Sequence, residues 1–293
     1  MQKISDIFAT RDRTFSIEVF PPKTEAGIET LFETVGVLAQ TINPDYVSVT
    51  YGAGGSTSKT TPAVINGLNS RYGLTCMHHL TLVSQTRDAL AENIRQMKRD
   101  GMRNILALRG DPPPEMGKEF VKVEGGIEYC YELIDLIRET GGDYFSIGVA
   151  GFPEGHPTCP TKELDTEYLK IKVDRGAQFV ITQFFFENEM YSEYLDRTSR
   201  AGVNVRIIPG VLPITNYDKL ISFAERCGAY ICQRIHETFQ AIRDDPAMIM
   251  KQGVEYAVEQ CEDLLRRGAP GIHFYCLNQV EPVSTVWRRA VAG

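Results

Sequence analysis

The feature that most constrains the fold is a short apolar segment that recurs along the whole chain. Each copy is rich in β-branched or aromatic residues, as expected for a buried strand. There are eight of them, at 15–20, 46–52, 74–82, 104–110, 144–152, 178–186, 205–213 and 271–278. Most steps between them, roughly thirty to forty residues, suit parallel strands joined by right-handed helical crossovers. Eight such units predict an α/β fold, a closed (β/α)8 barrel of the TIM type rather than an open sheet.

Segments with helical periodicity lie between these predicted strands. ETLFETVGVLAQTI, TRDALAENIRQMKRDG and DTEYLKIKVDRGA are examples, and the last two close on glycine, a common helix terminator. The final step is longer, because residues 214–270 hold a surplus of helical sequence. No linker, low-complexity tract or charge block divides the chain. We therefore expect one barrel domain over residues 1–293, with extra helices before the last strand.

Composition and charge narrow the classes of function. The 31 basic and 38 acidic residues form no long runs of one sign, which argues against nucleic acid or a membrane as a partner. No stretch approaches the ~18 apolar residues of a membrane span, and the polar start does not resemble a secretory signal. The seven cysteines are scattered and never spaced CxxC, which argues against disulfides or a thiolate zinc site. We expect a cytoplasmic protein that holds no metal.

Polar side chains gather where the predicted strands end, which is where barrels place their active sites. Glu18 alternates with Ile17 and Val19, so it shares a face with Ser16, and we expect that face to line the lumen. A poorly solvated carboxyl group favours its protonated form, as a general acid requires. The alternative is a structural glutamate paired with a nearby cation. The other candidates at strand ends are Thr50, His79, Arg109, Asp111, His156, Gln183, Tyr275 and Asn278.

Three of these candidates have open alternatives. Arg109 and Asp111 flank Gly110, so they could clamp a polar ring or phosphate, or form an internal salt bridge. Gln183 precedes three phenylalanines and suits a flat heteroaromatic ligand, although a hydrogen-bonded core glutamine would have the same sequence. The stretch YGAGGST could bind an anion through backbone amides or form a tight turn, and no G-x-G-x-x-G fingerprint or Walker loop is present.

Taken in order, the strand ends resemble the methylenetetrahydrofolate reductase family. The resemblance rests on SIEVFPPKT, PDYVSVTYGAGGST, HLT, ALRGDPP, AGFPEGHP, DRGAQFVITQFFF, IIPGVLP and HFYCLN, over roughly residues 15 to 290. It implies an eight-stranded barrel that carries non-covalent FAD. It also implies reduction of 5,10-methylenetetrahydrofolate to 5-methyltetrahydrofolate by a ping-pong mechanism, with NADH or NADPH as the reductant of FAD.

The resemblance further implies roles for individual residues. Glu18 matches the proton donor, and Asp111 matches the catalytic aspartate beside flavin and pterin. Positions that match the FAD-lining set are Tyr51, Ala53, His79, Arg109, Gly110, Asp111, Cys130, Phe152, His156, Cys159, Asp165, Tyr168, Ile171 and Lys172. Positions that match substrate contacts are Thr50, Asp111, Gln183, Lys219, Phe223, Tyr275 and Gln279. As a bare sequence feature, Phe223 would be a core residue. Arg109, His156 and Lys172 would balance the charge of the FAD pyrophosphate.

Five positions depart from the bacterial pattern. Phe152 replaces a tyrosine, Lys219 stands where a glutamine is usual, Gln279 stands where an arginine is usual, and Cys159 and Ile171 also differ. The exchange at Lys219 and Gln279 suggests that one positive charge for the glutamate tail of folate has moved.

Two alternatives to this reductase stay open. One is a reductase that receives electrons through a partner subunit, and the other is a flavin- or folate-binding barrel without turnover. In each case we expect a homo-oligomer.

Overall fold

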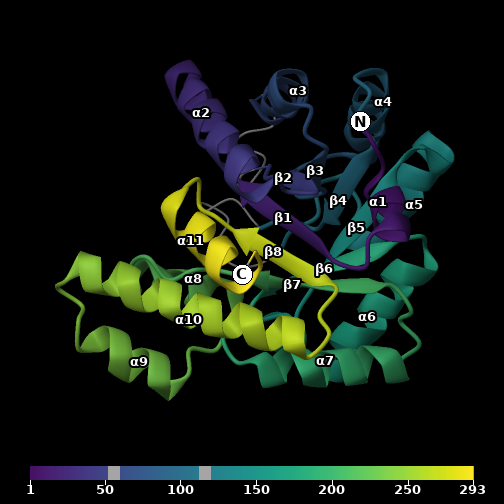
Figure 1. The fold of residues 1–293 in the computed structure, drawn as a ribbon. Coiled ribbons are helices and arrows are strands. Elements are labelled where there is room, and N and C mark those ends of the chain that lie inside the picture. The colour runs from purple at the N-terminus through teal and green to yellow at the C-terminus, as the bar shows by residue number, and fades with distance from the viewer. Residues whose placement is uncertain (52–59, 112–119, 293) are drawn as a thin grey trace.

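The computed structural model describes residues 1–51, 60–111 and 120–292, whose strands close into one barrel (Figure 1). Each strand pairs in parallel with the next along the chain, and β8 pairs with β1. The strands are β1 (Thr14–Val19), β2 (Tyr46–Val49), β3 (Cys76–Thr81), β4 (Asn104–Leu108), β5 (Ser146–Gly151), β6 (Phe179–Phe184), β7 (Arg206–Val211) and β8 (Gly271–Tyr275). The predicted TIM-type barrel is confirmed, and every strand overlaps the segment predicted for it.

Helices cover the outside of the barrel. They are α2 (Glu25–Ile42), α3 (Thr60–Tyr72), α4 (Arg87–Arg99), α5 (Cys130–Gly141), α6 (Lys162–Asp174), α7 (Asn188–Arg200) and α11 (Glu281–Ala290), with a short 3-10 turn at Gly142–Tyr144. Threonine side chains cap the N-termini of three of them, at Thr24, Thr86 and Thr161. Strand residues such as Ile17 and Val19 share one large apolar cluster with helix residues. This cluster between the sheet and the helices is the main core.

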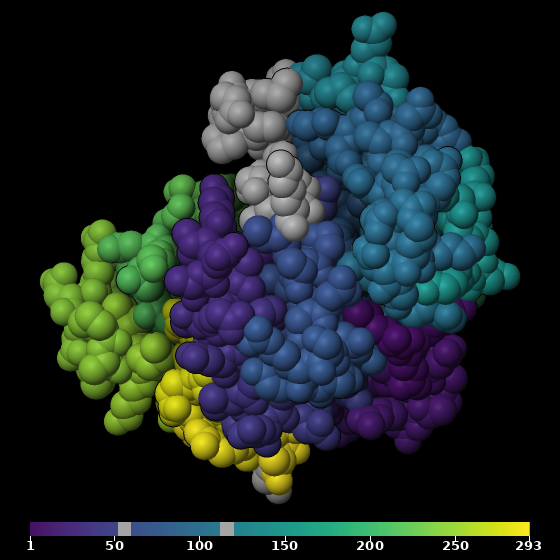
Figure 2. All heavy atoms as spheres, turned by 90° about the horizontal axis from the view of Figure 1, so that it is seen from above, coloured from purple at the N-terminus to yellow at the C-terminus, as the bar shows by residue number. Residues whose placement is uncertain are grey.

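Three further helices lie between β7 and β8, as the surplus of helical sequence predicted. They are α8 (Tyr217–Cys227), α9 (Gln233–Gln240) and α10 (Pro246–Arg266). Tyr217 and Phe239 of these helices pack with Phe184 and Phe186 from the end of β6 in a second apolar cluster. The yellow-green part of the chain forms a lobe at one side of the molecule (Figure 2). The second apolar cluster holds α8 beside the C-terminal end of β6.

A helix that we did not predict, α1 (Ile4–Thr10), closes the N-terminal end of the barrel. Ile4 is fully buried, and its backbone N–H donates to Asn104 Oδ1 over 2.7 Å. Ile4 and Phe8 pack against six lumen residues of five strands, namely Tyr46, Met77, Leu106, Phe179, Ile181 and Ile208. The lower lumen is therefore apolar and filled, which leaves only the opposite end of the barrel open to a ligand.

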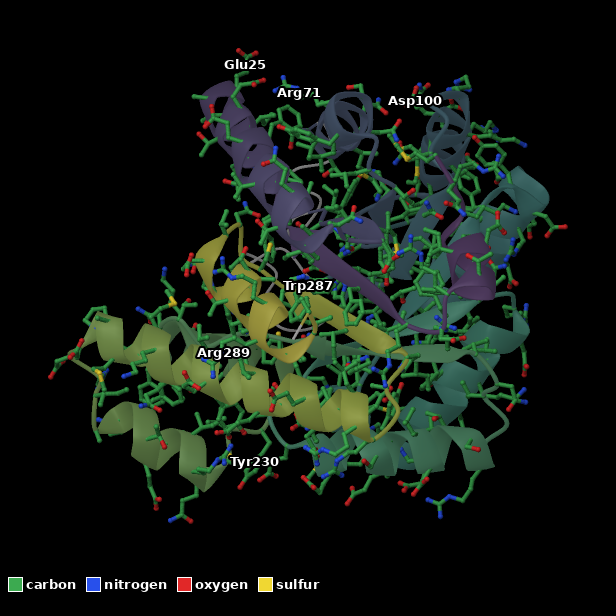
Figure 3. The ribbon with its side chains drawn as sticks, viewed as in Figure 1. Glu25, Arg71, Asp100, Tyr230, Trp287 and Arg289 are labelled. Atoms are coloured by element: carbon green, nitrogen blue, oxygen red, sulfur yellow. The ribbon has the colours of Figure 1, made fainter. Side chains whose placement is uncertain are left out.

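The last helix, α11, packs over β1 and α10 (Figure 3). The Trp287 ring meets the Phe15 ring edge-on, with centroids 4.8 Å apart. Arg289 binds the Glu255 carboxylate of α10 through both guanidinium nitrogens, over 2.6 and 2.7 Å. These contacts anchor the helical layer beside β8. Within the described ranges, no helix is both long and apolar enough to cross a bilayer.

Candidate active site at the barrel mouth

Glu18 lies in the lumen near the C-terminal end of β1, as the alternation of side chains predicted. Its side chain is almost fully buried, with 7% of the residue exposed, while Ile17 and Val19 face the outer helices. Two imidazole nitrogens approach its carboxylate: His79 Nε2 lies 3.4 Å and His273 Nε2 lies 3.5 Å from the oxygen Oε2. No lysine or arginine of the described ranges pairs with Glu18. The structural alternative, pairing with a permanent cation, is therefore not supported.

The two histidines beside Glu18 are braced by serines. Ser48 Oγ lies 2.5 Å from His79 Nε2, and Ser16 Oγ lies 2.7 Å from His273 Nδ1. Burial lowers the pKa of His79, although the Glu18 charge partly opposes this. His79 is therefore neutral near pH 7.

His79 contacts Glu18 in the structure, and its predicted contact with FAD stays a prediction. Sequence analysis missed His273, although a signal was present. His273 lies two residues before Tyr275 on β8, so the two share the lumen face.

The end of β2 offers an unpaired hydroxyl. Thr50 follows β2 directly and is 7% exposed, and its Oγ1 has no hydrogen-bond partner in the described part of the chain. The next residue, Tyr51, is buried with its ring centroid 5.6 Å from that of His78. Ala53 and the rest of the glycine-rich stretch lie outside the described residues. Because buried polar groups are normally satisfied, Thr50 Oγ1 suits a polar atom of a ligand.

Gly110, at the end of β4, allows the backbone to turn where no side chain fits. Its φ is +85°, and an added Cβ would lie 2.8 Å from both Thr81 Cβ and Val83 Cγ1. Asp111, the next residue, is exposed at the mouth. The required glycine thus places this carboxylate beside the open end of the lumen.

The Arg109 side chain contacts Thr158 and Phe120. Its Nη2 donates to Thr158 Oγ1 over 3.3 Å, and its guanidinium carbon lies 5.1 Å from the centroid of the Phe120 ring. Among the described residues, no ion pair joins Arg109 to Asp111. Of the two alternatives left by the sequence, the ligand clamp is therefore favoured over the internal salt bridge.

Positive charge gathers between the ends of β4 and β5. Lys172 of α6 donates its Nζ to Ala150 O over 3.1 Å. Burial, followed by the charges of Arg109 and Lys172, lowers the pKa of His156 to about 4. The same two charges oppose the burial that raises the pKa of the Cys130 thiol. Arg109 and Lys172 therefore lie near one another and carry the positive charge, whereas His156 is neutral without a bound anion.

Two further residues predicted to line FAD, Phe152 and Asp165, lie near this cationic region. The His156 ring meets Phe152 edge-on at 4.6 Å, and Tyr168 stacks on Tyr129 with centroids 5.9 Å apart. Asp165 is buried in the first turn of α6, where burial raises its pKa and Lys172 opposes the shift. Two of the residues that differ from the family pattern are more accessible to solvent: Cys159 is half-buried, and Ile171 is exposed.

A β-bulge presents Gln183 at the end of β6. The register between β6 and β7 shifts between Ile181 and Phe184, so the residues between them leave the regular ladder. The Gln183 side chain is half-buried, and its Oε1 accepts a hydrogen bond from the Phe184 backbone N–H over 3.0 Å. This bond holds the amide oxygen beside the backbone of Phe184, and the contact of Gln183 with a flat ligand stays a prediction.

Tyr275, the last residue of β8, pairs in register with Glu18. Its hydroxyl donates to Thr182 O over 2.8 Å, which fixes the ring across the mouth. Gln279 follows β8 and is half-buried. Asn278 joins the ends of β1 and β8, because its side-chain amide binds both the N–H and the C=O of Phe20.

The end of helix α8 lies within range of the charges of both carboxylates of the site. The pKa of the Cys227 thiol is raised to about 11 by burial and then by the negative charges of Asp111 and Glu18. Sequence analysis gave this cysteine no role, and nothing in its spacing indicated the position. Earlier in α8, Phe223 is half-buried beneath the Arg226 guanidinium at 5.0 Å, and Lys219 is exposed.

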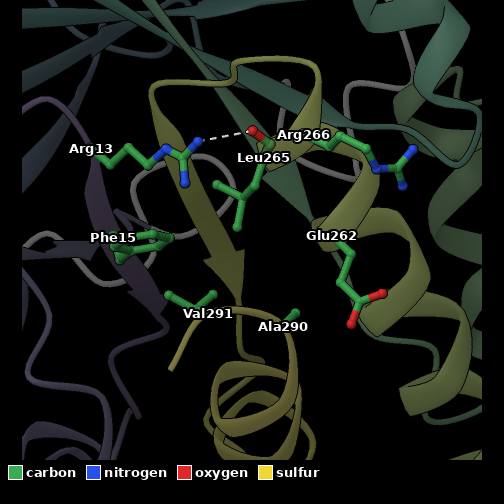
Figure 4. A pocket seen from close by; sticks show the side chains of 7 residues that line it. All are labelled: Arg13, Phe15, Glu262, Leu265, Arg266, Ala290 and Val291. Carbon is green, nitrogen blue, oxygen red and sulfur yellow. Dashed lines mark hydrogen bonds between the residues drawn. The ribbon is translucent and has the colours of Figure 1, made fainter. Parts of the chain in front are cut away.

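A cavity of about 450 Å³ lies at the start of β1, away from the strand ends that hold Glu18 (Figure 4). Arg13, Phe15, Glu262, Leu265, Arg266, Ala290 and Val291 line it. Arg13 Nη2 donates to Leu265 O over 3.0 Å. The cavity is separate from the candidate site.

Across the described ranges, no group of three His, Cys, Asp or Glu side chains could hold a metal ion.

Residues 3–290 match the family model described as "Methylenetetrahydrofolate reductase". The chain belongs to the methylenetetrahydrofolate reductase family. The resemblance drawn from the strand ends is thereby confirmed, and the match covers the whole barrel.

Relatives of two lengths share this methylenetetrahydrofolate reductase barrel. The Salmonella typhimurium protein named 5,10-methylenetetrahydrofolate reductase is 38% identical over 266 residues, which cover 91% of this chain and 86% of the relative. Methylenetetrahydrofolate reductase 1 of Schizosaccharomyces pombe is 35% identical over 277 residues, 94% of this chain and 45% of the relative. The Arabidopsis thaliana protein named methylenetetrahydrofolate reductase (NADH) 1 is 34% identical, over 95% of this chain and 48% of the relative. The chain thus spans about half the length of its fungal and plant relatives.

Solved structures support the fold of this family member independently. An uncharacterized protein from Clostridium thermocellum, described as binding two copies of 5-methyl-5,6,7,8-tetrahydrofolic acid, superposes with a TM-score of 0.63 at 15% identity. The match covers 97% of this chain and 96% of that one. At such low identity the similarity supports the barrel architecture alone.

Proposed function

We propose that this chain reduces 5,10-methylenetetrahydrofolate to 5-methyltetrahydrofolate, using FAD and a reduced nicotinamide in a ping-pong mechanism. The observation that carries the proposal is the buried carboxyl group of Glu18 at the barrel mouth, held beside a neutral imidazole. NADH or NADPH would serve as reductant. The name of the Arabidopsis relative specifies NADH, which makes NADH the first reductant to test.

The described residues fit FAD. Arg109 and Lys172 offer two positive charges for a pyrophosphate, and Gly110 lets a ligand approach the backbone. Thr50 has a buried hydroxyl that pairs with none of the described residues. When bound, FAD would accept a hydride from the nicotinamide and deliver it to the folate. His156, neutral at rest, would add a hydrogen bond to the pyrophosphate rather than a fixed charge.

The residues of the chain would supply what hydride transfer to the folate requires. Methylenetetrahydrofolate accepts hydride poorly until its five-membered ring opens to an iminium cation, and opening requires a proton on the leaving nitrogen. Glu18 would give that proton, and the Asp111 carboxylate would stabilise the cation. Gln183 presents its amide beside apolar surface for the flat rings of substrate or nicotinamide.

Glu18→Gln tests this proposal. The variant lacks the acidic proton, so the folate half-reaction should slow by about 10²- to 10⁴-fold, the usual contribution of a general acid. Bleaching of the flavin by NADH should stay within about twofold of the wild type, because hydride transfer to the flavin needs no proton from Glu18. Stopped-flow absorbance at the flavin band would measure both steps.

The control is Glu259→Gln, which changes an exposed glutamate on α10 and should alter neither step. Equal losses in both half-reactions of Glu18→Gln would indicate a structural role and contradict the assignment of the proton donor.

Two other functions make different predictions. A reductase that receives its electrons from a partner subunit would hold flavin, but neither NADH nor NADPH would bleach it rapidly. A binding barrel without turnover would be yellow yet inert toward methyltetrahydrofolate and an artificial electron acceptor. The spectrum of the purified protein and these two mixing experiments separate the three functions.

A further inference from the structure

Two histidines from opposite sides of β1 approach the same oxygen of Glu18. His79 on β3 and His273 on β8 each make their closest contact with Oε2, at 3.4 and 3.5 Å. Their serine braces come from β2 and β1. The wall formed by β8, β1, β2 and β3 thus directs two imidazole nitrogens at one carboxylate oxygen of Glu18, Oε2.

The two histidines differ in how the ring nitrogen that approaches Glu18 is hydrogen-bonded. His79 Nε2 already lies 2.5 Å from Ser48 Oγ, so its proton or lone pair is shared with that hydroxyl. His273 uses Nδ1 for Ser16, while its Nε2 is buried and has no hydrogen-bond partner in the part of the chain that the structure describes. An unsatisfied nitrogen in a fully buried ring, aimed at a carboxylate, needs an explanation.

We propose that His273 is the positioning residue for Glu18. Its Nδ1 accepts a hydrogen bond from the Ser16 hydroxyl, which leaves the ring proton on Nε2, and Nε2–H donates to Glu18 Oε2. Oε1 is then the oxygen that carries the proton for the folate. This inference rests on the proposed function of Glu18. The 3.5 Å contact is longer than an ordinary hydrogen bond and should shorten when the folate fills the mouth.

The other titratable groups that face Glu18 do not compete with His273 for this role. Tyr275 ends β8 and Cys276 follows it directly. Burial raises the pKa of both, that of the Cys276 thiol to about 12. On α8, the pKa of Cys227 is raised to about 11. All three are neutral near pH 7 and act only weakly on the carboxylate. Asp111, which follows β4, raises the pKa of Cys227 by its negative charge, and a carboxylate cannot donate a hydrogen bond when ionised.

Ring-nitrogen NMR on the flavin-loaded protein tests the tautomer without reference to activity. In protein labelled with ¹⁵N-histidine, long-range ¹H–¹⁵N spectra at pH 7 should place the proton of His273 on Nε2 alone. The signal is assigned by its loss in His273→Gln. A proton on Nδ1 would overturn the proposal, because Ser16 would then accept rather than donate.

Rapid-mixing kinetics test the consequence for the reaction. His273→Leu removes the donor and should slow the folate half-reaction about ten- to hundredfold, the cost of one hydrogen bond to a charged group. His273→Gln restores an N–H near the position of Nε2 and should recover most of that rate. Without the donor the carboxylate is less stable, so the pH profile of the folate half-reaction should move to higher pH in His273→Leu.

The matched control is His236→Gln on α9, where the histidine pairs with Tyr217 away from the mouth. Since His273 is fully buried, Ser16→Ala provides a milder variant if His273→Leu loses its flavin, and it should give the same direction of change. Wild-type rates in His273→Leu, or equal losses in the Leu and Gln variants, would overturn the positioning role. If Glu18→Gln also reacted normally with folate, the assignment of Glu18 as proton donor would be wrong. The NMR measurement of the His273 tautomer does not depend on that result.

Discussion

Gly110 illustrates at the scale of one residue how the mouth depends on the backbone. Gly110→Ala adds a methyl group at a positive φ and 2.8 Å from Thr81 and Val83. We expect a loss of about 2–4 kcal/mol in the free energy of unfolding and weaker flavin retention. Gly125→Ala has a similar φ of +70° but no atom within 4 Å, so it should cost only about 1 kcal/mol. Urea denaturation would compare them, and equal losses would contradict the steric argument.

His156 gives a second prediction at this scale, for pH dependence. With a pKa of about 4, below the ordinary 6.5, this histidine stays neutral in the folded protein while it becomes charged in the unfolded chain. Its contribution to stability should therefore be complete above about pH 6.5 and decline as the pH falls toward 4.

NMR titration of the flavin-free protein measures the His156 pKa directly. The midpoint should lie near 4 and rise when FAD is added, because phosphate charge favours the imidazolium. Arg109→Gln should raise the midpoint of the flavin-free protein, since it removes one of the two opposing charges. A midpoint near 6.5 before FAD is added would contradict the effect of burial on this ring as well as the action of Arg109 and Lys172.

Among the helices, α1 is a short element with a large expected effect. Ile4→Ala removes a fully buried side chain from the cluster that fills the lower lumen, so unfolding should require about 2–5 kcal/mol less. Val37→Ala on α2, where the side chain is about half exposed, should change stability by no more than about 0.5 kcal/mol. Denaturation midpoints would check both. A small effect of Ile4→Ala would mean that α1 does not close the barrel.

Helix α8 carries Lys219, whose contact with the folate stays a prediction. The Lys219 backbone N–H binds the cap residue Asn216, which leaves the exposed ammonium group for a ligand. If that charge holds the glutamate tail of folate, Lys219→Gln should raise the KM for folate by about two- to fivefold, the range for an exposed ion pair. Lys251→Gln, an exposed lysine on α10, is the matched control. An unchanged KM in Lys219→Gln would refute the proposal that the charge moved here from position 279.

At the scale of the whole molecule, the residues that stabilise the barrel and the candidate catalytic residues lie at opposite ends of the lumen. The lower lumen is closed by α1 and apolar side chains, and the upper lumen holds Glu18 between two histidines. The upper end therefore needs no large structural core of its own. That the chain folds as one domain over residues 1–293 and assembles as a homo-oligomer stays a prediction, which sedimentation and thermal unfolding would test.

The sequence by itself determined the eight strands, the surplus helices and the strand ends that carry Glu18, Asp111 and Gln183. These features are local, because side-chain period, glycine and turn chemistry act over a few residues. The short helix α1 escaped prediction because seven residues carry too little periodicity to be distinguished from a polar terminus.

Only the tertiary structure decided that His79 and His273 meet at one oxygen of Glu18, and that the charges of Asp111 and Glu18 act on the pKa of Cys227. These residues lie on β3, β8 and α8, far from Glu18 in the chain. Their meeting depends on the register of parallel strands and on closure of the barrel, which set distances across the lumen and leave no mark in a local pattern.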